Sequence, residues 1–242
     1  MNIILKIQRY NPGTDERPYF QEYTLEVDPN ERLLDALMSV KRYQDGSLGF
    51  RKSCAHGVCG SDAMRINGKD RLACKTLIKE VAEQDGATIT VEPLRYMPVQ
   101  RDLIVDQADF FAKYRSVNPF LINDAPVAEK ERIQSQEERM RFDDTTNCIL
   151  CAACYSACPI FAKQPAFIGP AAIVQAFRFL ADTRDRGLAD RLPALDRPAG
   201  VWSCENHFEC TRCCPRSILI TKRINQTKKM IEKLHAGEGE GS

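Results

Sequence analysis

The stretch SCAHGVCGSDAMRINGKDRLAC, residues 53–74, decides the fold of the amino-terminal half of the chain. A C-x₄-C-x₂-C…C run holds a [2Fe–2S] cluster in plant-type ferredoxins. Cys54 and Cys59 have the first spacing and Cys74 stands at the distant last position, but the third position is Asp62. The sequence therefore predicts a [2Fe–2S] site in which a carboxylate replaces one thiolate.

Asp62 is the natural candidate for the missing ligand, because only three cysteines precede residue 148. A carboxylate carries the same unit charge as a thiolate, so the net charge of the site is kept. Gly57 and Gly60 suit a loop that wraps closely and turns backbone N–H groups toward the sulfurs. The alternative is a surface aspartate, with Ser61 or water as the ligand. His56 is expected to be exposed rather than coordinating.

Composition limits the class of protein. The chain has 242 residues, 43% of them hydrophobic and 28% charged, with a formal net charge of +1. A near-neutral charge argues against a partner made of nucleic acid. No apolar run approaches the roughly 18–20 residues that cross a bilayer. The opening residues lack a signal peptide or transit peptide pattern, so the chain is expected to stay where it is made.

The eleven cysteines fall into three groups rather than along the whole chain. Disulfide scaffolds belong mainly to small exported domains, whereas tight cysteine spacings in a cytosolic chain indicate metal binding. We therefore expect metal–thiolate sites rather than disulfides.

The pattern of the first hundred residues predicts a sheet with one helix. Strands are expected at 2–9, 19–27 and 88–93, a helix at 28–43 beginning at Asp28, and a tight turn at Asn67-Gly68. This order is that of a β-grasp ferredoxin domain.

In the remainder, 98–117 has helical apolar spacing, and 129–142 is charged and either helical or partly exposed. Further helices are expected at 168–182, with Pro170 in the first turn, and at 218–234. The fold class is therefore α+β: an amino-terminal β-grasp plant-type ferredoxin domain followed by an all-α bacterial two-cluster ferredoxin-like domain. We place the first domain at 1–104, the second at 105–235 and a disordered tail at 236–242. The basic residues of the last helix are interpreted as a solvated face: Lys222, Arg223, Lys228, Lys229 and Lys233.

The run CILCAACYSACP, residues 148–159, is the C-x₂-C-x₂-C-x₃-C-P motif of bacterial ferredoxins. In a two-cluster fold the fourth cysteine of such a run ligates the other cluster. A second run, CENHFECTRCCP at 204–215, ends in the same way but has His207 where the second cysteine is expected. The crossed pattern predicts a [4Fe–4S] cluster held by Cys148, Cys151, Cys154 and Cys214, and a [3Fe–4S] cluster held by Cys158, Cys204 and Cys210.

Two alternatives stay open at the three-thiolate site. Imidazole ligates iron in Rieske centres, so His207 could complete a [4Fe–4S] cluster. Cys213 could supply the fourth thiolate instead, or lie beside the site as a small buried neighbour.

With these motifs in this order, the chain resembles the iron–sulfur subunit of succinate dehydrogenase and fumarate reductase, respiratory complex II. The resemblance covers almost the whole chain and includes RYNP at 9–12, RDLIVD at 101–106 and FIGPAA at 167–172. Aspartate at the third [2Fe–2S] position also occurs in some members of that family.

The resemblance implies an electron relay. Electrons from succinate, oxidised at the FAD of a flavoprotein partner, would pass through the [2Fe–2S], [4Fe–4S] and [3Fe–4S] clusters to a quinone. Membrane-anchor subunits, with haem b as a further cofactor, would hold the chain as a peripheral protein on the cytoplasmic face of a prokaryotic inner membrane. No nucleic-acid partner is expected.

The residues expected near the quinone depart from the family pattern. Members that reduce ubiquinone often have a tryptophan where this chain has Lys163, and a histidine where it has Glu205. Pro159, Ile160 and Lys163 are the candidates for the quinone vicinity, although Lys163 can equally be an ordinary surface residue. The alternatives are a subunit serving another flavoprotein, a fumarate reductase working in the opposite direction, and a zinc-stabilised binding module.

Overall fold

The structure, a computed structural model, describes residues 1–126 and 129–237. The chain forms two compact units, each built from discontinuous segments. The first unit contains residues 1–107, 149–157 and 213–215, and the second contains residues 108–148, 158–212 and 216 onward. Of the predicted tail at 236–242, residues 238–242 lie outside the described residues.

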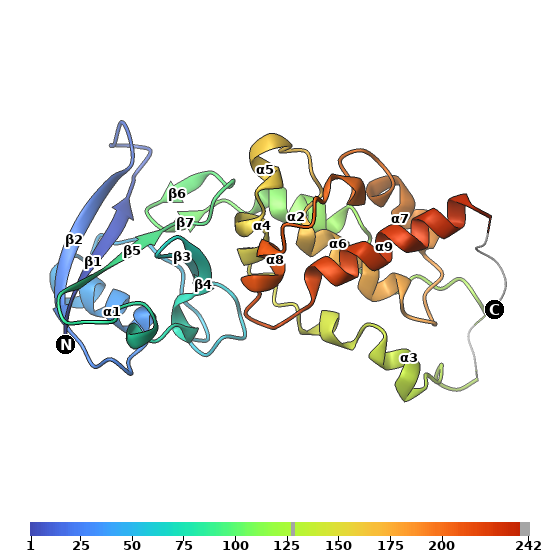
Figure 1. Ribbon diagram of the computed structural model, residues 1–242, viewed down its shortest axis with the longest axis horizontal. Coiled ribbons are helices and arrows are strands. Elements are labelled where there is room, and N and C mark those ends of the chain that lie inside the picture. Colours follow the sequence, from blue (N-terminus) through green and yellow to red (C-terminus); the bar gives the residue numbers. More distant parts are fainter. Residues whose placement is uncertain (127–128, 238–242) are drawn as a thin grey trace. The chain divides into compact units, whose positions relative to one another are not determined.

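A five-stranded mixed sheet forms the first unit, in the order β2-β1-β5-β3-β4 (Figure 1). Strand β1 pairs antiparallel with β2 and parallel with β5, and β3 pairs antiparallel with both β5 and β4. Alternate residues of β1 are buried, as expected of a strand with one face on the core. The strands predicted at 2–9, 19–27 and 88–93 are confirmed as β1 Asn2–Arg9, β2 Tyr19–Glu26 and β5 Ala87–Glu92. Two strands that were not predicted are β3 Ala63–Ile66 and β4 Lys69–Leu72.

The first helix of the first unit, α1, spans Leu33–Ser39 and continues into a π-helical turn at Val40–Gln44. The predicted start at Asp28 is wrong, because the Asp28 carboxylate accepts the backbone N–H of Asn30 and closes a turn there. Leu33, Leu34 and Leu37 of α1 are buried in the core. Two 3₁₀ turns, Ala73–Lys75 and Ile78–Glu80, follow β4.

A short hairpin replaces the first part of the helix predicted at 98–117. Strand β6, Val99–Arg101, pairs antiparallel with β7, Ile104–Val105, around Asp102 in a left-handed conformation of φ 48°. The carboxylate of Asp102 accepts Arg9 Nε at 3.0 Å and the N–H of Gly49 at 2.7 Å. These distant partners fix the turn, which local apolar spacing could not indicate.

The predicted turn between β3 and β4 is confirmed at Asn67-Gly68, where φ is 48° and 74°. Positive φ at both central residues is the signature of a type I′ hairpin turn. The run of residues 149–157 also belongs to this unit and contains the helix α4, Ala153–Ala157.

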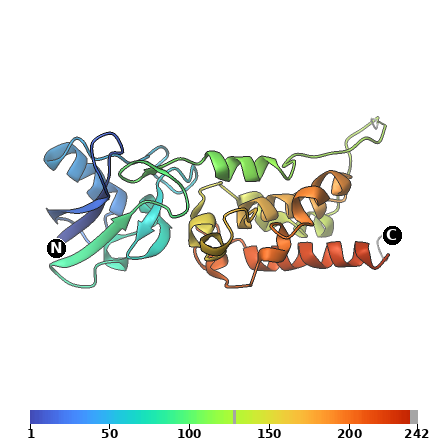
Figure 2. The ribbon, with the colours of Figure 1, turned by 90° about the horizontal axis from the view of Figure 1, so that it is seen from above.

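The described residues of the second unit form helices and turns (Figure 1). Figure 2 shows α9 in red as a long straight helix. Two 3₁₀ segments lie at Asp143–Asn147 and Val201–Ser203. The α-helices are α2 Ala108–Arg115, α3 Gln136–Met140, α5 Ile160–Lys163, α6 Pro170–Leu180, α7 Leu188–Leu195, α8 Glu209–Arg212 and α9 Ile220–His235.

Helix α6 is the centre of the second unit and packs against α9. Pro170 stands in its first turn, as predicted, and Ile173 and Phe177 are buried. On α9, Arg223 is buried and donates to Asp144 Oδ1 at 2.6 Å, so the expectation of a solvated basic face is wrong for this residue. In the part of the chain that the structure describes, no helix is long and apolar enough to cross a membrane.

Candidate metal centres

The loop from Cys54 to Asp62 bends back on itself around the first cysteine. Ala55, Gly57 and Gly60 have left-handed backbone, with φ of 60°, 81° and 70°. As a result the backbone N–H groups of His56, Val58 and Cys59 donate to Cys54 Sγ at 3.5, 3.4 and 3.3 Å. His56 itself is exposed, as predicted.

These backbone donors favour the charged form of the sulfur. The hydrogen bond from the His56 N–H, followed by those from Cys59 and Val58, lowers the pKa of the Cys54 thiol to about 6. A thiolate is the form that ligates iron. The loop therefore presents Cys54 already deprotonated at neutral pH.

Asp62 is 2% exposed, so it is not the surface aspartate of the alternative interpretation. Its Oδ2 accepts the backbone N–H of Cys74 at 2.6 Å, while its buried Oδ1 has no hydrogen-bond partner among the described residues. Buried acceptors are nearly always satisfied, so an unsatisfied one needs an explanation such as a missing ion. A carboxylate held by one oxygen and open at the other fits an iron ligand.

Cys74 lies against the same carboxylate. Burial, followed by the hydrogen bond to Asp62, raises the pKa of the Cys74 thiol to about 12. The N–H of Gly57 donates to this sulfur and acts in the opposite direction. Ser61, the alternative ligand, has its Oγ 3.2 Å from Cys59 Sγ. The structure thus brings together the donors that the sequence indicated: Cys54, Cys59, Asp62 and Cys74.

The two later cysteine runs share one backbone conformation. Leu150 and Ala152, two and four residues after Cys148, have φ of 53° and 63°. Asn206 and Phe208, two and four residues after Cys204, have φ of 59° and 64°. Equal offsets place His207 in its loop where Cys151 stands in the other, which is the alignment that the sequence predicted.

The four predicted [4Fe–4S] ligands are divided between the units. Cys151, Cys154 and Cys214 belong to the first unit and Cys148 to the second. Cys151 is buried and the other three are half-buried. Among the described residues, no group of three or more His, Cys, Asp or Glu side chains surrounds a single-ion position.

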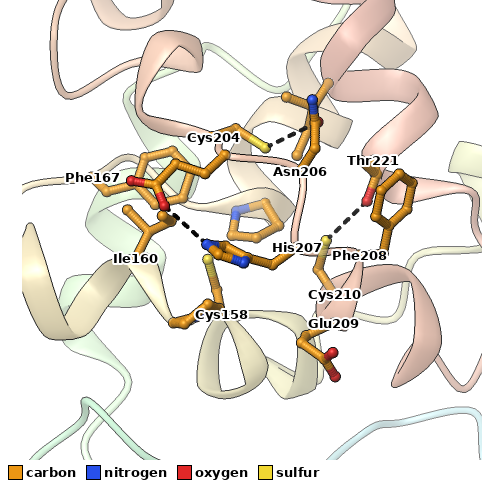
Figure 3. Close-up of a pocket in the computed structure, with 14 residues that line it drawn as sticks. Cys158, Ile160, Phe167, Cys204, Asn206, His207, Phe208, Glu209, Cys210 and Thr221 are labelled. Carbon is orange, nitrogen blue, oxygen red and sulfur yellow. Dashed lines mark hydrogen bonds and ion pairs between the residues drawn. The ribbon is translucent and has the colours of Figure 1, made fainter.

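A pocket in the second unit gathers the three remaining predicted ligands (Figure 3). It has about 300 Å³ of empty space, part of it open to solvent. Cys158 enters it just before α5, and Cys204 and Cys210 enter from the second run and α8. Cys213 is not among the described residues that line this pocket.

The three thiols lie close enough to influence one another. Burial raises the pKa of Cys158 to about 12, and the charges of Cys210 and Cys204 act in the same direction. Burial also raises the pKa of Cys210, whose Sγ lies 3.5 Å from Thr221 Oγ1. Thr221 is bonded in turn to Thr211 Oγ1 at 2.9 Å. Neither threonine carries a sequence signal, because hydroxyls of this kind are common on helices.

His207 lines the pocket, and its ring contacts Glu205. Its Nε2 lies 3.0 Å from Glu205 Oε2, and 43% of its side chain is exposed (Figure 3). Glu205 also forms an ion pair with Lys163 at 3.5 Å. Of the predicted quinone-vicinity residues, Pro159 and Ile160 line the pocket, whereas Lys163 has a side chain that is 71% exposed.

Comparison with known proteins gives the class first. Residues 4–112 match the model of a 2Fe-2S iron–sulfur cluster binding domain, and residues 144–218 match that of a 4Fe-4S dicluster domain. Fold and donors together define an iron–sulfur protein with two cluster-binding domains.

Full-length relatives then give the family. The succinate dehydrogenase iron–sulfur subunit of Coxiella burnetii is 42% identical over 96% of this chain and 98% of its own. The fumarate reductase iron–sulfur subunit of Mycobacterium tuberculosis is 41% identical over 97% of this chain and 94% of its own. The chain belongs to the family of succinate dehydrogenase and fumarate reductase iron–sulfur subunits.

A solved structure agrees with this assignment. A chain of the Mycobacterium smegmatis Sdh1 complex in the apo form superposes with a TM-score of 0.84 at 26% identity, covering 96% of both chains.

Proposed function

We propose that the chain relays electrons between the FAD of a flavoprotein subunit and a quinone, within a membrane-associated succinate:quinone oxidoreductase. The observation that carries this function is the relationship to succinate dehydrogenase iron–sulfur subunits over 96% of the chain, with every predicted cluster donor present in order. When bound, the clusters supply one-electron carriers. The dicarboxylate site belongs to the flavoprotein partner, so this chain is the relay and not the site of succinate chemistry.

For the first cluster we propose the ligands Cys54, Cys59, Asp62 and Cys74. The buried, unpartnered Oδ1 of Asp62 supports the carboxylate ligand. The domain fits a β-grasp ferredoxin, because α1 follows the β1–β2 hairpin and β5 then pairs parallel with β1. We place its boundary with the helical two-cluster domain at 104/105.

For the second domain we propose a [4Fe–4S] cluster on Cys148, Cys151, Cys154 and Cys214, and a [3Fe–4S] cluster on Cys158, Cys204 and Cys210. The three-iron assignment is supported by the three thiols that line one pocket. A cubane with only three thiolates readily loses the iron that lacks a ligand.

The partners follow from the family. They are a flavoprotein with FAD, membrane-anchor subunits with haem b, and a quinone near Pro159, Ile160 and Lys163. The anchors hold this chain as a peripheral protein on the cytoplasmic face of a prokaryotic inner membrane. The relatives do not favour the alternative of an iron–sulfur subunit for a different flavoprotein.

The test is low-temperature EPR of the complex purified through this chain, first air-oxidised and then reduced. We expect an oxidised [3Fe–4S] signal equimolar with the chain, and a [2Fe–2S] signal that appears on addition of succinate. Intact clusters that no dicarboxylate reduces or oxidises would contradict the assignment. Recovery of the anchors in the same preparation tests the membrane partners separately.

A further inference from the structure

Gly60 lies against the cysteine run of residues 149–157 with no room for a side chain. A Cβ added to Gly60 would stand 2.7 Å from Cβ and 3.0 Å from Cα of Cys151, and 3.1 Å from the carbonyl oxygen of Ile149. Carbon atoms in contact are normally about 3.5–4.0 Å apart. The obstructing atoms belong to backbone and Cβ, which cannot swing aside as the end of a flexible side chain can.

The position of this contact in the two cluster motifs gives it meaning. Gly60 follows Cys59 directly and stands two residues before Asp62, inside the loop of the first donor set. Cys151 is the second cysteine of the other donor set. Gly60 and Cys151 both belong to the first unit, so this contact between the two cysteine loops lies within one compact body.

A buried hydrogen bond between Ser156 and Asp70 connects the run of residues 149–157 to the sheet. The hydroxyl of Ser156 on α4 donates to Asp70 Oδ1 on β4 at 2.5 Å and accepts the backbone N–H of Arg95 at 2.8 Å. Ser156 and Asp70 are both buried. Loss of the hydroxyl would leave a buried carboxylate oxygen and a backbone N–H without this partner, so the pair resists movement of α4 away from β4.

We propose that Gly60 sets the separation of the [2Fe–2S] and [4Fe–4S] sites by allowing its loop to touch Cys151, and that the Ser156–Asp70 hydrogen bond keeps this contact closed. The inference rests on the ligand sets of the proposed function. It makes Gly60 and Ser156 positioning residues, since neither ligates iron.

The experiment uses the complex reduced with dithionite, in which both clusters are paramagnetic. Microwave-power saturation of the [2Fe–2S] signal measures how strongly the second paramagnet relaxes it, and dipolar coupling falls with the cube of the distance. In Gly60→Ala the loop must move by about 1 Å to restore normal carbon contacts. We therefore expect the [2Fe–2S] signal of this variant to saturate at lower power than that of the wild type, with iron content unchanged.

Gly86→Ala is the matched control. Gly86 also has positive φ, +78°, but an added Cβ there meets nothing within 4 Å. It therefore carries the same backbone strain without the obstruction, and should saturate like the wild type.

A second pair of variants decides the matter if Gly60→Ala yields no holo-complex. Ser156→Ala removes the fastening hydroxyl without adding bulk and should shift saturation in the same direction as Gly60→Ala. Asp70→Asn keeps the acceptor oxygen and should not. Wild-type saturation in Ser156→Ala, or in Gly60→Ala with both clusters intact, would overturn the proposal. A wild-type complex without a [2Fe–2S] signal would instead overturn the proposed [2Fe–2S] ligands, on which this inference rests.

Discussion

The carboxylate of Asp62 binds the backbone N–H of Cys74 through Oδ2 at 2.6 Å, and its Oδ1 is buried without a partner among the described residues. Oδ2 therefore fixes the carboxylate to the backbone at Cys74, while Oδ1 is left for another partner. In the proposed role of Asp62 as an iron ligand, the hydrogen bond to the Cys74 backbone would supply the rigidity that the shorter cysteine side chain has by itself.

Substitution of Asp62 should separate ligation from structure. Asp62→Cys restores an all-thiolate site, so we expect two irons to remain with altered g values in the reduced EPR spectrum. Asp62→Ala removes the ligand, and the [2Fe–2S] signal should disappear while the oxidised [3Fe–4S] signal persists. Ser61→Ala is the control, because it tests the alternative ligand in the same loop. A lost cluster in Ser61→Ala and a retained one in Asp62→Ala would reverse the assignment.

The three-iron site should not need His207, but a cysteine placed at this position should ligate iron. Because Cys158, Cys204 and Cys210 are the proposed ligands, His207→Ala should keep the oxidised [3Fe–4S] signal. His207→Cys places a thiolate at the offset that Cys151 has in the other loop, and should convert the site to an EPR-silent oxidised [4Fe–4S] cluster. Cys213→Ser should behave like the wild type. Silence of the wild-type oxidised complex, with intact iron content, would show that His207 or Cys213 is already a ligand.

Thiol reactivity after removal of iron should follow the pKa values of the ligands. Backbone hydrogen bonds, that of His56 first, lower the pKa of Cys54 to about 6, so its thiolate form grows as pH rises through 6 and predominates at pH 7. Burial raises the pKa of Cys158 to about 12, so it stays protonated at pH 8. Alkylation with iodoacetamide, mapped by mass spectrometry, should therefore label Cys54 with a midpoint near pH 6. Equal labelling of Cys158 at pH 7 would contradict this order.

The ion pair of Asp185 and Arg191 should be important for the stability of the second unit. Arg191 donates to both oxygens of Asp185 and to the carbonyl oxygens of Asn118 and Phe120, and both side chains of the pair are almost fully buried. Removing one partner leaves an uncompensated buried charge, which typically costs about 3–5 kcal/mol. We expect a loss of this size for Asp185→Ala in urea unfolding. The control is Asp190→Ala, at an exposed position beside Arg191 on α7. It should change the free energy of unfolding by no more than about 0.5 kcal/mol.

Local chemistry made much of this molecule predictable. The β1 strand follows from period-two burial, the Asn67-Gly68 turn from its need for positive φ, and the start of α6 from Pro170. The two cysteine runs likewise indicated that Cys158 shares a pocket with Cys204 and Cys210, because the fourth cysteine of such a run ligates the other cluster.

The hairpin and the contacts between distant segments could not be predicted, because residues far apart in the sequence determine them. The helix expected from residue 98 is a hairpin because Asp102 is held by Arg9 and Gly49, far away in sequence. The contact of Gly60 with Cys151 and the bond of Ser156 with Asp70 join residues about ninety positions apart. A single sequence carries no periodic signal for such pairs, so only the folded chain reveals them.

The left-handed residues of the two cysteine loops have a consequence for the order of assembly. Leu150, Ala152 and Phe208 are ordinary L-residues in a conformation that costs roughly 1–2 kcal/mol each. Thiolate–iron bonds closing around the loop are the natural source of compensation, and metal binding of this kind is coupled to folding. In a newly made chain, the sheet should therefore fold before the cysteine loops do. The loops would then still be open to the machinery that delivers iron and sulfide.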